Sequence, residues 1–285
     1  METYSILMSV YAKENPVFFE TAIQSMLDQT VKPDEFVIVC DGPLTRELDA
    51  VLQKYTLEYP ELFNIVRLPE NRGIGYAANA GLQVCRNDLV VKMDSDDISV
   101  PDRCRLQLQR FADNPNLVIV GGYIDEFMQA PEEPFSVRAV PETNEEIHRF
   151  ARRRQPFNNQ TVMYRRENAI KVGGYKDLRR NEDYDFYVRL LKDGSYAENI
   201  PVTLVKVRVN PAALRRRASW KTLTGCIRSR WCAYRIGFSS FWDFLYCVAG
   251  QVLIFVCPGK IQNMIYSKLL RQTCPEKREE KDLIN

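Results

Sequence analysis

The stretch "VVKMDSDDISVP", residues 90–101, places three carboxylates directly after an apolar run. Asp94, Asp96 and Asp97 occupy three of four consecutive positions. Carboxylates this close raise one another's pKa unless a cation neutralises them. The start of a helix uses one Asp or Ser as a cap and does not need three acids. The stretch therefore indicates a buried strand that ends in a site for a positively charged partner.

Short apolar runs alternate with helical periodicity on both sides of this stretch. The expected strands cover residues 4–11, 35–42, 63–68, 88–93 and 116–127. The expected helices cover residues 16–29, 45–60, 75–86 and 101–115. Strands rich in Val and Ile that alternate with helices of this length indicate an α/β fold with a parallel sheet and right-handed crossovers.

Residues 128–210 are less regular. A proline-rich stretch at 129–143 is expected to form loop or edge structure, and residues 144–154 a short amphipathic helix. A strand is expected at 159–166, and a helix at 182–194 that ends at Gly194.

Charge is distributed unevenly, although the net charge is only +2. Residues 211–271 carry ten Lys and Arg against one acid, whereas residues 1–210 carry a formal charge of −6. An acidic body joined to a basic, apolar tail suggests a surface that meets an anionic partner. One His and eight Cys without a CxxC pair argue against a zinc framework. The first residues lack the pattern of a signal peptide, so a reducing cytoplasm is the expected compartment.

Polar residues follow several of the expected strands. Tyr11, Asp41 and the Asp94–Asp97 cluster each stand at the carboxyl end of one. Ligands of open α/β sheets bind beyond these ends, at the switch point in strand order. The pattern therefore predicts one site that brings the three strand ends together.

The Asp94-Ser95-Asp96 triplet has two interpretations. Two carboxylates at i and i+2 after a strand can share a hard divalent cation that also holds a diphosphate, and magnesium or manganese suits such oxygen ligands. A turn followed by a helix cap is the structural alternative. The position at a strand end favours the metal site.

Two other segments are open to functional and structural interpretations. Asp41 either accepts hydrogen bonds from a nucleotide or forms an ordinary Asp-Gly turn, and residues 70–82 offer helix-start amides that favour phosphate. Glu182, Asp183 and Asp185 begin a helix, where acids complement the helix dipole or one of them acts as a general base. Their spacing does not separate these roles.

Two basic segments outside the tail are weaker candidates. Residues 151–156 (ARRRQP) are more typical of a solvated surface than of a phosphate site. His148 has no partner ligands nearby and is expected to be structural or exposed.

The C-terminal segment 244–257 is apolar for fourteen residues, which is shorter than the roughly twenty that a spanning helix needs. It is either a buried core helix or a helix that lies on a membrane. Aromatic residues before it and bases on both sides favour a monotopic tail on an anionic leaflet. The flanking bases are Arg228, Arg230, Arg235, Lys260, Lys268 and Arg271.

Four blocks together resemble the family 2 glycosyltransferases of GT-A type, in particular the bacterial enzymes of capsule, exopolysaccharide and lipopolysaccharide synthesis. The blocks occur in the expected order, and the resemblance covers about residues 4 to 205. They are residues 9–42, 70–82, 93–103 ("MDSDDISVPDR") and 173–191 ("GGYKDLRRNEDYDFYVRLL").

The resemblance implies a Rossmann-like, mostly parallel sheet flanked by helices. It also implies an inverting transfer from a nucleotide-diphosphate sugar, most often a UDP-sugar, with Mn²⁺ or Mg²⁺ as cofactor. Asp94 and Asp96 would hold the metal, and Asp183 would be the base, with Glu182 as the alternative. The implied nucleotide-sugar pocket consists of Tyr11, Glu14, Asp41, Arg72, Gly73, Asn79, Asp94 and Ser95. Relatives often carry His where this chain has Asn158 and Asn159, which leaves the role of that segment open.

The expected organisation is a glycosyltransferase domain at 1–210 followed by a helical, membrane-associating extension at 211–285. Within the domain, residues 1–127 form the nucleotide-sugar half and residues 128–210 the acceptor half. The acceptor is expected to be lipid-linked, at the cytoplasmic face of the membrane. Two alternatives remain: a nucleotidyltransferase-like enzyme with the same half-fold, and an inactive, membrane-attached binding module.

Overall fold

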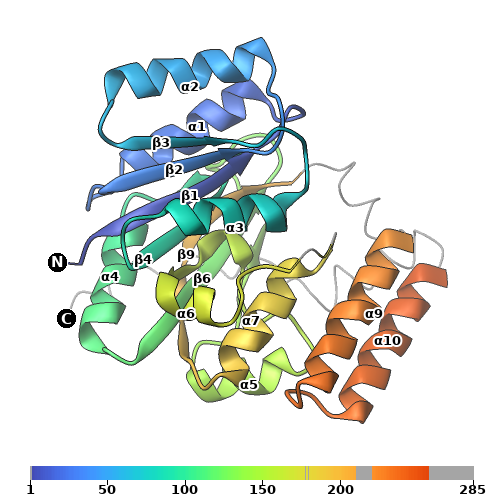
Figure 1. The fold of residues 1–285 in the computed structure, drawn as a ribbon. Coiled ribbons are helices and arrows are strands. Elements are labelled where there is room, and N and C mark those ends of the chain that lie inside the picture. The colour runs from blue at the N-terminus through green and yellow to red at the C-terminus, as the bar shows by residue number, and fades with distance from the viewer. Residues whose placement is uncertain (1, 177, 179, 210–219, 257–285) are drawn as a thin grey trace.

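The computed structural model describes residues 2–176, 178, 180–209 and 220–256. Its centre is a mixed sheet in the order β3-β2-β1-β4-β8-β6-β9-β5, with β7 paired to β6 (Figure 1). The first four strands along the chain are parallel to one another. They are β1 (Tyr4–Val10), β2 (Glu35–Cys40), β3 (Phe63–Arg67) and β4 (Leu89–Asp94).

Both antiparallel and parallel pairs complete the sheet beyond β4. β8 (Met163–Arg165) runs antiparallel to both of its neighbours, β4 and β6 (Leu117–Phe127), so β6 keeps the direction of β4. β9 (Tyr196–Arg208) lies parallel to β6. The short strands β5 (Ile98–Ser99) and β7 (Ser136–Arg138) pair antiparallel to β9 and β6. The expected Rossmann-like order therefore holds for the N-terminal part, and the complete sheet is mixed.

Helices cover both faces of the sheet because successive strand residues alternate between two apolar cores. One core joins Ile6 and Met8 of β1 to three helices: α1 (Pro16–Leu27), α2 (Arg46–Glu58) and α4 (Arg103–Asp113). The other core joins Leu7 to helices on the opposite face, namely α3 (Ile74–Val84), α5 (Asn144–Ala151), α6 (Arg166–Lys171) and α7 (Glu182–Lys192).

Local capping explains several helix starts. Asn15 accepts hydrogen bonds from the amides of Val17 and Phe18 before Pro16, and Thr45 caps α2. Thr143 and Glu146 form a capping box at α5. These elements lie where the sequence predicts them.

The sequence prediction does not include β9, α6 or the two-residue strand β5, and it makes one strand too long. The long strand β9 contains Pro201, and its pairing with β6 shifts register between Gly122 and Tyr123, where the partners pass from Ile200 to Thr203. A bulge of this kind accommodates a proline, which obscures the strand pattern. Helix α6 was also missed. The strand expected over 159–166 is reduced to β8, because a 3-10 turn precedes it and α6 follows.

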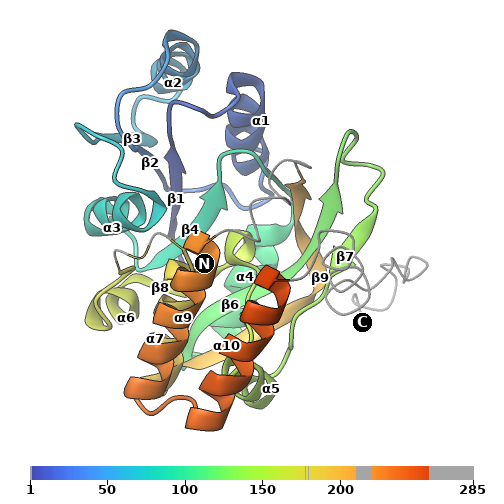
Figure 2. The same cartoon turned by 90° about the vertical axis from the view of Figure 1, so that its right-hand side faces the viewer.

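Two C-terminal helices lie beside the sheet domain. Helices α9 (Trp220–Arg235) and α10 (Phe241–Val256) form a hairpin, and α9 packs on α7 (Figures 1 and 2). Tyr184 and Val188 of α7 share a small apolar cluster with Ala233 of α9.

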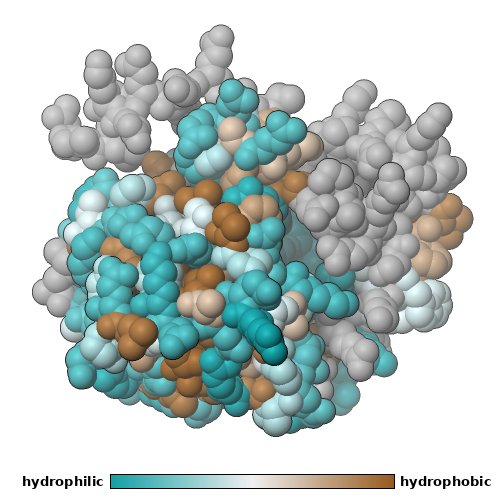
Figure 3. Space-filling view, turned by 90° about the horizontal axis from the view of Figure 1, so that it is seen from above, coloured by the Kyte–Doolittle hydropathy of each residue, from teal (hydrophilic) through white to brown (hydrophobic). Residues whose placement is uncertain are grey.

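Helix α10 is not a core helix, because much of its apolar surface is exposed; Trp242, Leu253 and Val256 are 75%, 60% and 73% exposed. Figure 3 shows an apolar patch at the edge of the molecule on the side of this hairpin. Among the described residues, no helix has the length and apolarity required to cross a membrane. The flanking bases Lys260, Lys268 and Arg271 lie outside the described residues.

Candidate functional site

The end of β4 carries a buried ion pair. Lys92 is 4% exposed, and its Nζ lies 2.5 Å from Oδ1 of Asp94. Beneath it, the fully buried Arg103 donates to the carbonyl oxygen of Lys92 at 2.8 Å. Burial lowers the pKa of Arg103 to about 10, so its guanidinium is still charged at neutral pH. The positive charges of Lys92 and Arg103 thus offset part of the carboxylate charge at this strand end.

The other acids of this loop remain crowded. Burial, followed by the charges of Asp94 and Glu14, raises the pKa of Asp96 to about 7. Burial and the charges of Asp96 and Asp94 raise the pKa of Asp97 well above its usual value, although Asp97 accepts a hydrogen bond from the Arg208 amide at 3.0 Å. A cation beside Asp96 would relieve this repulsion.

The donor set fits a metal that is shared with a ligand. Within the described ranges, no three His, Cys, Asp or Glu side chains converge to hold a metal alone. Magnesium commonly uses one or two carboxylates and completes its shell with water and substrate phosphates. Asp94 and Asp96 offer oxygen ligands of this type, while Glu14 accepts a hydrogen bond from Ser95 at 2.8 Å and so tethers the loop after β1 to the triplet.

The acid after β2 holds a neighbouring loop. The two carboxylate oxygens of Asp41 accept hydrogen bonds from the amides of Arg72 and Gly73 at 2.8 and 2.9 Å. Gly42 has φ +87°, and a Cβ there would lie 2.8 Å from the amide nitrogen of Asn71. In this structure the amides expected to face a phosphate are therefore bound by Asp41.

The remaining residues expected in the pocket each have a different environment. The guanidinium of Arg72 stacks on the ring of Tyr76, 3.7 Å from its centre, and Tyr11 is 40% exposed. Asn79 of α3 donates to the carbonyl of Tyr175 at 2.5 Å and accepts from its amide at 2.7 Å. Asn79 thus fixes the turn that precedes α7.

The first residues of α7 bring two acids together. Asn181, immediately before the helix, has the left-handed φ of 59°. Asp183 accepts hydrogen bonds from the side chain of Gln155 and from the Tyr184 amide, both at 2.7 Å. Burial and the charge of Asp183 raise the pKa of Glu182 to about 7, and burial raises the pKa of Asp183. Asp185 differs because Arg189 and Lys176 pair with it, which indicates a structural role.

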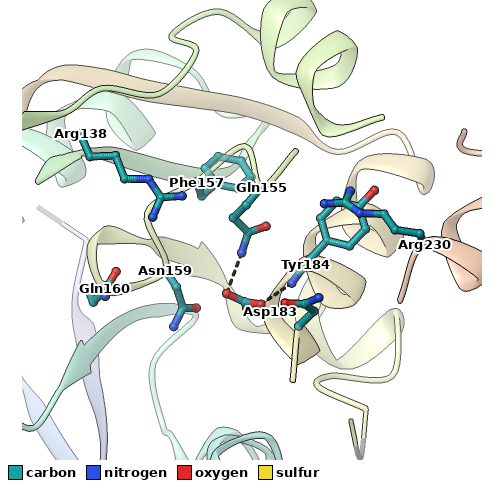
Figure 4. A pocket seen from close by; sticks show the side chains of 9 residues that line it. Arg138, Gln155, Phe157, Asn159, Gln160, Asp183, Tyr184 and Arg230 are labelled. Carbon is teal, nitrogen blue, oxygen red and sulfur yellow. Dashed lines mark hydrogen bonds between the residues drawn. The ribbon is translucent and has the colours of Figure 1, made fainter. Parts of the chain in front are cut away.

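A cavity of about 300 Å³ opens above Asp183 (Figure 4). Figure 4 shows Gln155 reaching Asp183 from one side and Arg230 lying across the ring of Tyr184 on the other. The residues that line the cavity are Arg138, Gln155, Phe157, Asn159, Gln160, Asn181, Asp183, Tyr184 and Arg230.

Lys92 links the two groups of acids electrostatically. The charge of Lys92, which is paired with Asp94, also lowers the pKa values of Glu182 and Asp183. Burial raises the pKa of Tyr187 of α7, and the charges of Asp183 and Asp94 raise it further. The fold therefore joins the carboxyl end of β4 to the start of α7.

Several residues of this site were missed in the sequence. Lys92 had a visible signal, namely a single charge within the apolar run "LVVKM". Gln155 ends a basic run that is typical of a solvated surface. Arg138 and Arg230 can be recognised as residues of this site only in the folded chain. The sequence predicts Arg230 as one of the membrane-flanking bases, whereas in the structure it lines the cavity. Arg138 reaches the cavity from an edge strand.

The two asparagines at the position where relatives often carry His have different roles. Asn158 is buried and donates to the carbonyls of Gly122 and Arg138, which is a structural function. Asn159 lines the cavity and accepts from the Tyr187 hydroxyl at 2.7 Å. The half-buried His148 lies near the carbonyls of Asn144 and Leu191, which agrees with the expectation that it is structural or exposed.

Solved structures share this fold. The chain resembles the mannosyltransferase PcManGT of Pyrobaculum calidifontis in complex with GDP-Man and Mn²⁺, with TM-score 0.61 and 15% identity over 93% of this chain and 78% of that one. It also resembles S. aureus TarS, with TM-score 0.60 and 16% identity over 94% of this chain and 46% of that one. These likenesses confirm a GT-A type α/β fold.

The relatives found by sequence are more similar to this chain than the solved structures are. An uncharacterized glycosyltransferase of Haemophilus influenzae is 36% identical over 94% of this chain and 99% of its own length. A UDP-Gal:alpha-D-GlcNAc-diphosphoundecaprenol beta-1,3-galactosyltransferase of Escherichia coli is 31% identical over 94% of this chain and 97% of its own. The amylovoran biosynthesis glycosyltransferase AmsE of Erwinia amylovora is 36% identical over 76% of this chain and 80% of its own.

The family model described as glycosyl transferase family 2 matches residues 5–181, which span the strand-end acids and all of the sheet up to β8. This match and the relatives favour a glycosyltransferase over the nucleotidyltransferase-like enzyme and the inactive binding module. The protein belongs to glycosyl transferase family 2 and is a glycosyltransferase.

Proposed function

We propose that this glycosyltransferase moves a sugar from a UDP-sugar to a hydroxyl group of a lipid-linked polysaccharide precursor, with inversion at the anomeric carbon. The E. coli relative, by its name, uses UDP-Gal and a diphosphoundecaprenol-linked acceptor. The P. calidifontis neighbour binds GDP-Man together with Mn²⁺. Both names support a nucleotide-diphosphate donor.

One observation carries the proposal: buried Lys92 couples Asp94 of β4 to Asp183 and Glu182 of α7. Inverting displacement needs a leaving diphosphate on one side of the anomeric carbon and a base for the acceptor on the other. Two groups of acids that are both affected by the charge of one buried cation support this division of labour.

In the proposed donor site, Asp94 and Asp96 hold Mn²⁺ or Mg²⁺. A bound divalent cation would stabilise the negative charge that the departing diphosphate acquires. Ser95 and Glu14 brace the loop, and Tyr11, Asp41, Arg72, Gly73 and Asn79 form or support the nucleotide pocket.

In the proposed acceptor site, the carboxylate of Asp183 takes the proton of the acceptor hydroxyl. The acceptor oxygen forms a bond to the anomeric carbon, the bond from that carbon to the diphosphate oxygen breaks, and the nucleoside diphosphate leaves with the electron pair. Gln155 and the Tyr184 amide orient the Asp183 carboxylate. Glu182 is the alternative base because it lies next to Asp183 and its pKa is about 7.

The proposed organisation follows from these roles. Residues 1–127 form the nucleotide-sugar half, residues 128–210 the acceptor half, and residues 211–285 a tail that contacts the cytoplasmic face of an anionic membrane. The exposed Trp242 and Tyr246 of α10 support this contact, and Tyr246 lies next to Arg153 and Arg154. Aromatic side chains favour the headgroup boundary, and arginines favour anionic lipid.

A donor panel tests the proposal. Purified full-length protein would be incubated with nucleotide sugars, a lipid-diphosphate-linked sugar and Mn²⁺, Mg²⁺ or EDTA, and the product's anomeric configuration determined by NMR. We expect metal-dependent release of one nucleoside diphosphate, an inverted product, and loss of both in Asp96→Ala.

Asp102→Ala is the matched control, because Asp102 is an exposed acid close to Asp96 in the chain that pairs with Arg105. Retention of configuration, or full activity in Asp96→Ala, would contradict the proposal.

A further inference from the structure

Arg230 of α9 enters the cavity above Asp183 from outside the segment that the family model matches. Its guanidinium lies flat over the ring of Tyr184, 3.5 Å from the ring centre (Figure 4). Stacking uses the face of a guanidinium and leaves the N–H groups at its edge available for hydrogen bonds.

Two of these edge donors are unused. Nε and Nη1 of Arg230 are buried and have no hydrogen-bond partner among the residues that the structure describes. A buried, charged donor without a partner costs free energy, and the cost is recovered when an acceptor binds. The unsatisfied edge of Arg230 is therefore suited to a ligand.

The charges around the cavity specify the ligand's sign. Arg138 enters from β7 and Arg230 from α9, whereas Asp183 is the one carboxylate among the nine lining residues. The other polar members are neutral side chains such as Asn159 and Gln160. Two guanidinium groups, each with a planar fork of donors, match the oxygens of a phosphate.

The position of the hairpin fits a phosphate that is attached to a lipid. Helix α9 packs on α7 through Tyr184, Val188 and Ala233, so the cavity wall and the hairpin are fixed to each other. Gly225 reinforces this contact, because a Cβ there would meet the Cβ of Arg180 at 2.7 Å. Helix α10, with its exposed apolar side chains, is packed on α9.

We propose that Arg230, together with Arg138, binds the phosphate group through which the acceptor sugar is attached to its lipid. The acceptor would then lie with its phosphate on the guanidinium groups and its hydroxyl at Asp183, and the lipid would leave along the hairpin. This inference rests on the proposed function, and it assigns the C-terminal hairpin a direct part in acceptor recognition.

The test is a titration of farnesyl diphosphate, a short isoprenyl diphosphate, into full-length protein that is already saturated with UDP and Mn²⁺. Saturation blocks the donor site, so binding reports a second site. We expect wild type to bind the probe and Arg230→Gln to bind it about 10 to 100-fold more weakly, as the loss of a charge-assisted hydrogen bond implies. Arg138→Gln should weaken binding in the same direction.

Arg228→Gln is the matched control, because Arg228 is an exposed arginine on the same helix. It should bind farnesyl diphosphate like wild type. Arg230→Lys keeps the charge without the fork and should give an intermediate affinity, and melting temperatures measured on all variants would identify a folding defect. UDP affinity should be unchanged in Arg230→Gln.

Two further probes distinguish the sources of the anion. Farnesol, which lacks the phosphates, should not bind measurably, and inorganic pyrophosphate should compete only weakly because it lacks the lipid. Equal binding of farnesol and farnesyl diphosphate, or an equal loss in Arg228→Gln and Arg230→Gln, would overturn the proposal. Pyrophosphate that binds as tightly as farnesyl diphosphate would overturn the assignment to a lipid-linked acceptor.

Failure of the proposed function would look different. If wild type did not bind UDP with Mn²⁺, the donor assignment would fail, and the same farnesyl diphosphate titration without nucleotide would still compare Arg230→Gln with Arg228→Gln.

Discussion

The two groups of acids in this enzyme have different surroundings. At the end of β4, burial and then the charges of neighbouring carboxylates raise the pKa of Asp96. At the start of α7, burial raises the pKa of Asp183, and the next four effects in size all lower it. They come from the Tyr184 amide, Lys92, Gln155 and Arg138. In the first group, nearby cations offset only part of the crowded carboxylate charge, which suits a metal site. The second is surrounded by donors, which suits a carboxylate that must accept a proton.

The largest expected effect is that of Asp183→Asn. Loss of a general base typically costs about 10² to 10⁴-fold in rate, so kcat should fall by that amount while donor affinity stays the same. Steady-state kinetics together with UDP titrations measure the two quantities. Activity within threefold of wild type would move the role of base to Glu182, which Glu182→Gln would then reveal.

Asp96→Asn should lower turnover by about 10²-fold at saturating Mn²⁺, because a metal that stabilises the leaving group contributes several kcal/mol. Unlike Asp183→Asn, this variant should show an increased requirement for metal. A Mn²⁺ titration of initial rates separates the two variants. An unchanged metal dependence would contradict the assignment of Asp96.

Lys92→Met removes the cation that the two groups share. Without its positive charge the pKa of Asp183 should rise, so kcat/KM should need a higher pH to reach its plateau. We expect an activity loss of about tenfold at pH 7 that is partly recovered at pH 9. A loss that is uniform across pH would mean that Lys92 acts on the donor side alone.

Glu182→Gln should stabilise the folded protein. The pKa of Glu182 in the folded state, about 7, lies above the usual value of 4.5, so ionisation disfavours folding and wild-type stability falls as pH rises from about 4.5 to 7. At pH 8 the variant should gain about 1 to 3 kcal/mol, given about 1.4 kcal/mol per pKa unit. At pH 4 the gain should vanish, which thermal denaturation at the two pH values would show.

The two groups also differ in how far the sequence predicts their surroundings. The strand-end acids follow an apolar run on one continuous segment, so β4, the Asp94–Asp97 cluster and the neighbouring helices can be read locally. The surroundings of Asp183 come from segments that are distant in the sequence, because Gln155, Arg138 and Arg230 belong to a loop, an edge strand and a C-terminal helix. Spacing along the chain contains no trace of that convergence.

Two particular residues illustrate this limit. Asn79 stands in a helix of small residues, and its pairing with Tyr175 across 96 positions depends on how the sheet folds. Arg230 belongs to a basic, aromatic segment that is typical of a membrane-contacting helix. Its stacking on Tyr184 depends on the packing of α9 against α7.

The most direct test of a division between donor and acceptor acids is a UDP titration of three proteins: wild type, Asp96→Asn and Asp183→Asn, each with Mn²⁺ and with EDTA. We predict that Mn²⁺ tightens UDP binding in wild type and in Asp183→Asn, and that this tightening is lost in Asp96→Asn. Equal metal dependence in all three proteins, or its loss in both variants, would contradict the division.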